Sequence, residues 1–245
     1  MAALVEGTQA IEVEQRVLRR DDCDVSIEHA RPEGMPKAGI VVCPDIFGSR
    51  ALFTDMAGRL ASHGFAVAVV EPFARVDFEL RAAHADDAPT RMSWVSSLDD
   101  DDQLGDLEAA ANLLVIEDDV THVGVLGFCM GGMYTLKASK LERFDAAVAF
   151  YGMIRVPQHW QGAGQGEPLA GIEHACKSLA IFGSVDPYSP EDEIAALRAA
   201  WRDRPDCEVI VIEGAEHGFV HAPERPAHRA DDAAALWSRT LDWLS

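Results

Sequence analysis

The sequence predicts an α/β protein with a mostly parallel central sheet and helices on both of its faces. Short runs of almost continuously apolar residues alternate along the chain with longer segments of helical periodicity. Such runs are typical of strands that are covered on both sides. Because parallel neighbours need a crossover connection, usually a helix, the alternation itself favours a parallel arrangement.

Six apolar runs are expected to form the centre of the sheet, at residues 39–43, 65–70, 122–126, 146–150, 178–182 and 208–212. Two more polar runs, residues 12–19 and 24–29, suit antiparallel edge strands, which gives about eight strands. Helices are expected at about residues 50–63, 103–117, 131–141, 190–202 and 228–244. No repeat and no Pro/Gly/Ser-rich linker divides the chain, so residues 1–245 are expected to form a single domain.

The charge of the chain argues against several kinds of partner. Its 245 residues carry 21 Lys and Arg against 41 Asp and Glu, a formal net charge of −20. Such a surface repels phosphate backbones and anionic lipids, so no nucleic-acid or membrane partner is expected. No apolar run approaches the roughly 18 residues that span a bilayer, and the N-terminus lacks a secretory pattern. We expect a cytoplasmic monomer or homodimer.

The five cysteines are odd in number and widely spaced, with no CxxC pair and no cluster at zinc spacing. Reduced thiols are therefore expected, and neither a metal nor another cofactor. Cys129 lies between Gly127 and Gly131, after a predicted strand and before a predicted helix. This G-x-nucleophile-x-G pattern permits a very tight turn that leaves the sulfur free at a helix N-terminus, where the dipole favours a thiolate. The alternative is a buried cysteine in a glycine-rich turn.

An acid and a base follow two later strands. Asp186 comes after the run that ends at residue 182, and His217 lies in a glycine-flanked loop after residue 212. Taken singly, Asp186 could form an Asx turn or a helix cap, and His217 could be an ordinary loop histidine. Nucleophile, acid, base is nevertheless the chain order of the α/β-hydrolase fold. Active sites of such sheets lie at the carboxyl ends of the strands, so these residues are predicted to form a triad with Cys129.

The segment after the first buried strand is a candidate for binding a reaction intermediate. The backbone N–H of Ile46 is expected to pair with that of Met130, the residue after the nucleophile, as an oxyanion hole. Asp45 is either a turn former or a carboxylate beside the thiol. Candidates for contacts with the substrate include Phe47, Trp94 and Tyr151, and Trp160 also lies in a stretch that could cover the site.

These features resemble the dienelactone hydrolase family, cysteine-dependent members of the α/β-hydrolase fold. The resemblance covers nearly the whole chain and is carried by residues 44–48, 71–75, 105–109, 127–132 and 215–219. It implies Cys129 as nucleophile, His217 as base and Asp186 as the acid that orients it. It also implies that Asp45, a position often held by Glu in the family, interacts with the resting thiol and shifts when substrate binds.

Substrate recognition is expected to depart from the family. Members acting on dienelactone hold its carboxylate with two arginines; Arg91, or its competitor Arg81, could be the first, but His221 occupies the second position. Neutral imidazole is a poorer carboxylate clamp than a guanidinium, so the reaction is expected to carry over better than the substrate. We expect a small-molecule lactone or activated carboxylic ester, cleaved through a thioester acyl-enzyme. The alternative is a non-catalytic or differently specialised small-molecule binding protein of the same fold.

Overall fold

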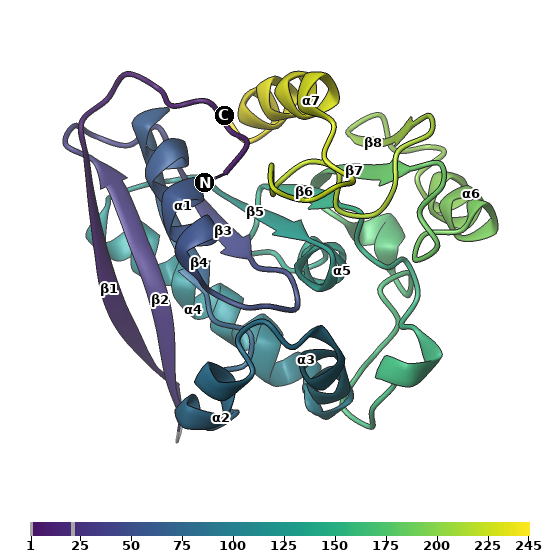
Figure 1. Cartoon of the computed structure of the whole chain (residues 1–245). Coiled ribbons are helices and arrows are strands. Elements are labelled where there is room, and N and C mark those ends of the chain that lie inside the picture. The colour runs from purple at the N-terminus through teal and green to yellow at the C-terminus, as the bar shows by residue number, and fades with distance from the viewer. Residues whose placement is uncertain (1, 21–22) are drawn as a thin grey trace.

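The computed structural model describes residues 2–20 and 23–245, and an eight-stranded sheet runs through its centre (Figure 1). The strand order is β1-β2-β4-β3-β5-β6-β7-β8; β1 and β2 are antiparallel to their neighbours, and all other pairs are parallel. The strands are β1 (Ile11–Arg20), β2 (Cys23–Pro32), β3 (Ala38–Cys43), β4 (Phe65–Val70), β5 (Val123–Phe128), β6 (Ala146–Phe150), β7 (Lys177–Gly183) and β8 (Cys207–Ile212). The predicted α/β class and mostly parallel sheet are confirmed.

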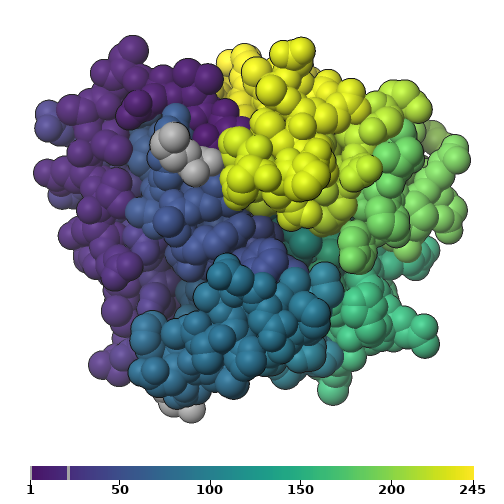
Figure 2. All heavy atoms as spheres, in the orientation of Figure 1, coloured from purple at the N-terminus to yellow at the C-terminus, as the bar shows by residue number. Residues whose placement is uncertain are grey.

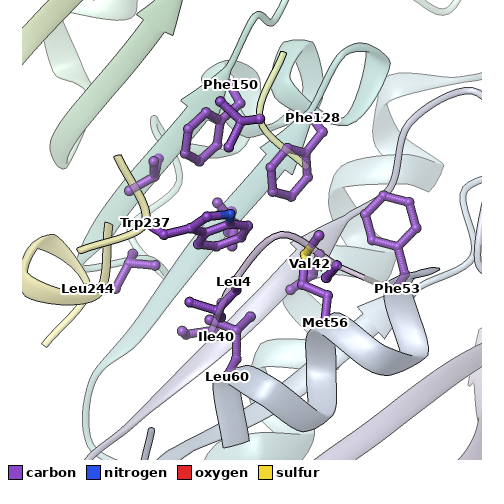
Figure 3. Packing of buried hydrophobic residues seen from close by; sticks show 14 of the residues in the cluster. Leu4, Ile40, Val42, Phe53, Met56, Leu60, Phe128, Phe150, Trp237 and Leu244 are labelled. Atoms are coloured by element: carbon purple, nitrogen blue, oxygen red, sulfur yellow. The ribbon is translucent and has the colours of Figure 1, made fainter. Parts of the chain in front are cut away.

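Helices cover both faces of this sheet. The α-helices are α1 (Ala51–Ser62), α2 (Phe78–Ala83), α3 (Ala88–Trp94), α4 (Asp100–Glu117), α5 (Met130–Ala138), α6 (Glu191–Ala200) and α7 (Ala230–Trp243). Helices α1 and α7 pack on one face, while α4, α5 and α6 pack on the other. Figure 3 shows the first of these layers, where Phe53 and Met56 of α1 and Trp237 of α7 meet residues of the strands such as Val42 and Phe150.

The observed elements lie close to the predicted ones, and their ends have local causes. Helix α4 begins at Asp100, three residues before the expected start, because the Asp99 carboxylate accepts the Asp101 N–H at 2.9 Å and caps the helix. Helix α5 ends at Ala138 rather than at residue 141. Helices α2 and α3 occupy a stretch for which the sequence suggests no element. No helix in the described part of the chain has the length and apolarity needed to cross a membrane.

The topology determines where a site can form. The chain passes from β3 to β4 on one side, whereas β5 lies on the other side of β3, so the direction of winding changes between β3 and β5. Parallel sheets leave a crevice at the carboxyl ends of two such strands. On the face seen in Figure 2, the segment with α2 and α3 (dark blue) and the C-terminal segment (yellow) lie around the chain that follows β3.

Candidate active site

Cys129 occupies the turn between β5 and α5, with a left-handed backbone at φ 57° and ψ −120°. A side-chain-bearing residue rarely adopts positive φ, and holding it there costs about 1–3 kcal/mol. The turn depends on its glycines: a Cβ on Gly127 would lie 2.2 Å from the carbonyl oxygen of Gly131, and one on Gly131 would lie 2.0 Å from that of Cys43. Cys129 is consequently held at the start of α5, half-buried, where it lines a cavity.

His217, in the loop after β8, is held by Asp186, in the turn after β7. Nδ1 of His217 lies 2.8 Å from Oδ2 of Asp186, whose side chain is fully buried. Oδ1 of the same carboxylate accepts the backbone N–H of Tyr188 at 2.9 Å. Because Asp186 accepts through both of its oxygens, it fixes the imidazole in one orientation with Nδ1 as a donor.

The other ring nitrogen of His217 is directed to the neighbourhood of Cys129. Nε2 is buried and makes no hydrogen bond of normal geometry with the described residues, yet the sulfur lies close enough to act on its charge. Burial alone would lower the pKa of His217, but the interactions with Cys129 and with the Asp186 carboxylate outweigh burial and raise the pKa to about 10. The structure therefore brings the three predicted triad residues together. A sulfur beside an imidazolium is the arrangement found in activated cysteine nucleophiles.

Two backbone amides are available next to the sulfur. Ile46, after β3, and Met130 are buried in one hydrophobic cluster, and Ile46 lines the same cavity as Cys129. Within the described residues, the Ile46 N–H donates to no backbone acceptor. Met130 is the first residue of α5, where an N–H has no acceptor inside the helix. Among the described residues, both amides thus lack a backbone acceptor, which the predicted oxyanion hole requires.

A cavity of about 450 Å³ opens onto Cys129 and His217. Its apolar wall is formed by Ile46, Phe47, Ala88, Met92, Met153 and Trp160. Its charged lining consists of Asp45, Arg50, Asp86, Glu224 and Arg225. A concave, largely apolar space of this size suits a small molecule that is oriented by a few polar groups. Among the candidates from the sequence, Phe47 and Trp160 have the expected place.

Arg91, Arg81 and Trp94 do not line this cavity. The guanidinium of Arg91 is buried and donates to the backbone carbonyls of His84 and Arg81, at 2.9 and 3.0 Å. Arg81 lies 3.6 Å from the carboxylate of Glu71. Trp94 packs beside the Arg91 guanidinium. Arg91 thus connects α3 to α2, and Arg81 connects α2 to the segment after β4.

Tyr151 and His221 are also placed differently from expectation, whereas Asp45 follows the first of its two interpretations and forms a turn with Phe47 and Gly48. Tyr151 and His221 are buried behind the cavity, where the Tyr151 hydroxyl bonds to His221 Nδ1. Asp45 lines the cavity, but its carboxylate bonds to Arg50, to His221 and to the Phe47 N–H rather than to the thiol. The aspartate is short, and these donors already occupy both of its oxygens. His221 therefore contacts the protein instead of lining the substrate cavity.

Sequence reasoning missed Arg50, Arg225, Tyr188 and Met153 as residues of the cavity. The place of Arg50 at the cavity could have been predicted from the sequence, because Arg50 lies five residues after Asp45 and just before α1. No sequence pattern indicates the place of Arg225, since it depends on the course of the loop that follows His217. Its guanidinium packs against Gly218, where a Cβ would lie 2.8 Å from Cζ.

The strand order, the turn at Cys129 and the adjoining Asp–His pair define an α/β-hydrolase. The comparison with family models gives the group within that class: the model described as "Dienelactone hydrolase family" matches residues 26–245. The chain belongs to this family. It is accordingly a hydrolase of carboxylic esters or lactones, and the expected fold, family and class of enzyme are confirmed.

Individual relatives are more distant. A protein of Bradyrhizobium sp. named "Probable 2-oxo-3-(5-oxofuran-2-ylidene)propanoate lactonase" is 27% identical over 212 residues, covering 84% of this chain and 82% of that one. The carboxymethylenebutenolidase of Rhodococcus opacus is 26% identical over 209 residues, covering 84% and 79%. The crystal structure of the "Putative Dienelactone Hydrolase" of Klebsiella pneumoniae subsp. pneumoniae superposes with a TM-score of 0.86 at 25% identity, covering 96% of this chain and 98% of that one.

Proposed function

We propose that this chain hydrolyses a small lactone or activated carboxylic ester, with Cys129 as the nucleophile. The observation that carries the proposal is geometric: Asp186 holds Nδ1 of His217 at 2.8 Å, and His217 and Cys129 line the same cavity. The thiolate adds to the carbonyl carbon, and the resulting oxyanion is stabilised by the N–H groups of Ile46 and Met130.

The reaction then proceeds through a thioester on Cys129. The intermediate collapses, the bond from carbon to the leaving oxygen breaks, and His217 gives its proton to that oxygen. A water molecule next attacks the thioester carbonyl while His217 takes the water's proton. The carbon–sulfur bond breaks, the carboxylic acid leaves, and the thiolate and the imidazolium are regenerated. No oxidant, metal or further co-reactant is needed.

Sulfur restricts the substrates that react. A thiolate leaves a tetrahedral intermediate more readily than an alkoxide or an amine, so poor leaving groups return to substrate. Enol lactones and aryl esters expel stabilised oxyanions and should react, whereas amides should not. The relatives named as a lactonase and as carboxymethylenebutenolidase support a lactone as the natural substrate.

The test compares Cys129→Ala with Cys207→Ala, a matched control at a half-buried cysteine at the start of β8. With an aryl acetate and an enol lactone, we expect kcat/KM to fall by about 10⁴-fold or more in Cys129→Ala. The control should keep its activity. Intact-protein mass spectrometry of the rapidly quenched wild type should show one added acyl group, which peptide mapping assigns to residue 129. An active Cys129→Ala variant, or an acyl group elsewhere, contradicts the proposal.

A further inference from the structure

The carboxylate of Asp45 is surrounded by donors to an extent that a turn former does not need. Oδ1 accepts from the Phe47 N–H at 3.0 Å and from Nη1 of Arg50 at 2.7 Å. Oδ2 accepts from Nη2 of Arg50 at 2.9 Å and lies 2.9 Å from Nε2 of His221. Burial opposes ionisation of Asp45, but the bonds from His221 and Arg50 outweigh it and keep the pKa of this carboxyl well below its usual range.

His221 is the partner that comes from the distant part of the chain, 176 residues from Asp45. It is 1% exposed and stacks on Phe128, with the ring centroids 4.9 Å apart. Burial lowers the pKa of His221 despite the bond to Asp45, so the ring is neutral. A neutral imidazole has one N–H, and Asp45 accepts it at Nε2, which leaves Nδ1 as an acceptor for the Tyr151 hydroxyl.

Tyr151 is held in place at an energetic cost. Its φ of +39° makes it, with Cys129 and Asp119, one of three non-glycine residues with positive φ in the described chain. Such strain is concentrated at functional sites. The strained backbone brings the ring between the two histidines: it bonds to His221 and meets the His217 ring edge-on, with the centroids 5.1 Å apart.

We propose that His221 is a positioning residue for ester hydrolysis. Its tautomer is selected by Tyr151, and its Nε2–H holds Asp45. Asp45 in turn fixes the turn at residues 45–48 through the Phe47 N–H, and so sets the direction of the Ile46 N–H toward the reacting carbonyl. The inference rests on the proposed function, in which Ile46 stabilises the oxyanion. A misplacement of about 1 Å in such a group can cost 10²-fold in rate.

Two reactions of Cys129 distinguish the positioning role of His221 from an effect on the thiol itself. Hydrolysis of an aryl acetate needs the oxyanion hole, whereas alkylation of Cys129 by iodoacetamide needs the thiolate but forms no oxyanion. We expect Tyr151→Phe, which keeps the ring but loses the hydroxyl, to lower kcat about 10-fold. KM and the alkylation rate should change less than about 2-fold, because the cavity and the Cys129–His217 pair are intact.

Variants at residue 221 test the bond to Asp45 itself. His221→Leu removes the donor and should lower kcat about 10²-fold, again with alkylation preserved. His221→Gln can place an amide N–H near the position of Nε2 and should recover much of the rate. Tyr134→Phe is the matched control, because the buried Tyr134 hydroxyl has no hydrogen-bond partner among the described residues.

Each other outcome overturns the proposal. A parallel fall in alkylation would mean that His221 acts on the Cys129–His217 pair or on the fold. A raised KM with unchanged kcat would make it a substrate contact, and unchanged kinetics would leave it no role. Failure of the proposed function is separately visible, because Cys129→Ala would then remain active whatever the variants at residues 151 and 221 do.

Discussion

The site contains two Asp–His pairs of similar geometry whose histidines have opposite pKa shifts. Asp186–His217 and Asp45–His221 have nearly equal N···O distances, 2.8 and 2.9 Å. The pKa of His217 is nevertheless raised, although burial opposes it, whereas burial and the charges of Arg50 and Arg225 lower the pKa of His221. A carboxylate partner alone therefore does not decide the protonation of a buried histidine. Burial and the remaining neighbours decide it: Cys129 helps to outweigh burial at His217, whereas at His221 burial prevails and the charges of Arg50 and Arg225 add to it.

The two pairs are expected to differ most in their effect on kcat when the carboxylate of each is replaced by a neutral amide. Asp186→Asn should leave the ring of His217 in the wrong tautomer and lower kcat by about 10⁴-fold. Asp45→Asn should cost far less in rate, because Asp45 acts on the turn and not on the reacting base. Steady-state kinetics with one aryl acetate measures both, and equal losses in the two variants would remove the distinction between the pairs.

The same two variants should reverse their order in stability. Asp45→Asn leaves the Arg50 guanidinium without its anion and exchanges an acceptor for an amide in a buried network, which should cost about 2–3 kcal/mol of the free energy of unfolding. Asp186→Asn should cost about 1 kcal/mol, because one neutral hydrogen bond can still form. Urea unfolding at neutral pH gives both values. A more stable Asp45→Asn protein would contradict the network.

The opposite pKa shifts predict opposite dependence of stability on pH. His217 binds its proton more tightly in the folded state, so its contribution is full below about pH 6.5 and is lost as the pH rises toward 10. His221 is favoured in its neutral form, so its contribution is full above about pH 6.5 and is lost as the pH falls below it. Unfolding of the wild type, His217→Gln and His221→Gln from pH 5 to 9 separates the two, and slopes of the same sign would refute the assignment.

The smallest effect concerns the cations around the second pair. Arg50 forms an ion pair with Asp45. Arg225 lines the cavity and makes no ion pair with a carboxylate in the described part of the chain. Arg225→Gln should lower kcat/KM for an aryl ester that carries a carboxylate by about 10-fold relative to its methyl ester. Arg81→Gln is the control and should leave this ratio unchanged. Equal ratios in the wild type and Arg225→Gln would exclude contact between Arg225 and the substrate.

The predictable parts of the molecule are those encoded over short distances. The apolar runs give the strands, and the glycines beside Cys129 give the turn, because each depends on a few consecutive residues. The order of Cys129, Asp186 and His217 follows once the strands are known, since parallel strands bring their carboxyl ends to one edge.

The parts that were mispredicted depend on side chains meeting across the fold. Asp45 allowed two interpretations from the sequence, and neither included His221, which comes from a distant loop. Arg91 had a suitable position in the chain, but α2 and α3 turn its guanidinium to backbone carbonyls. The direction of a long side chain is decided by the packing of its own segment, which no local pattern records.

The half-buried sulfur of Cys129 has a consequence for handling the protein. In the proposed mechanism Cys129 reacts as a thiolate, and a thiolate within reach of small molecules is also the form that peroxides oxidise, first to the sulfenic acid and then to states that thiols no longer reverse. Storage in air should therefore cause a loss of activity that dithiothreitol restores at first and later does not. Cys43, fully buried and with a pKa raised to about 12 by burial, should remain reduced throughout.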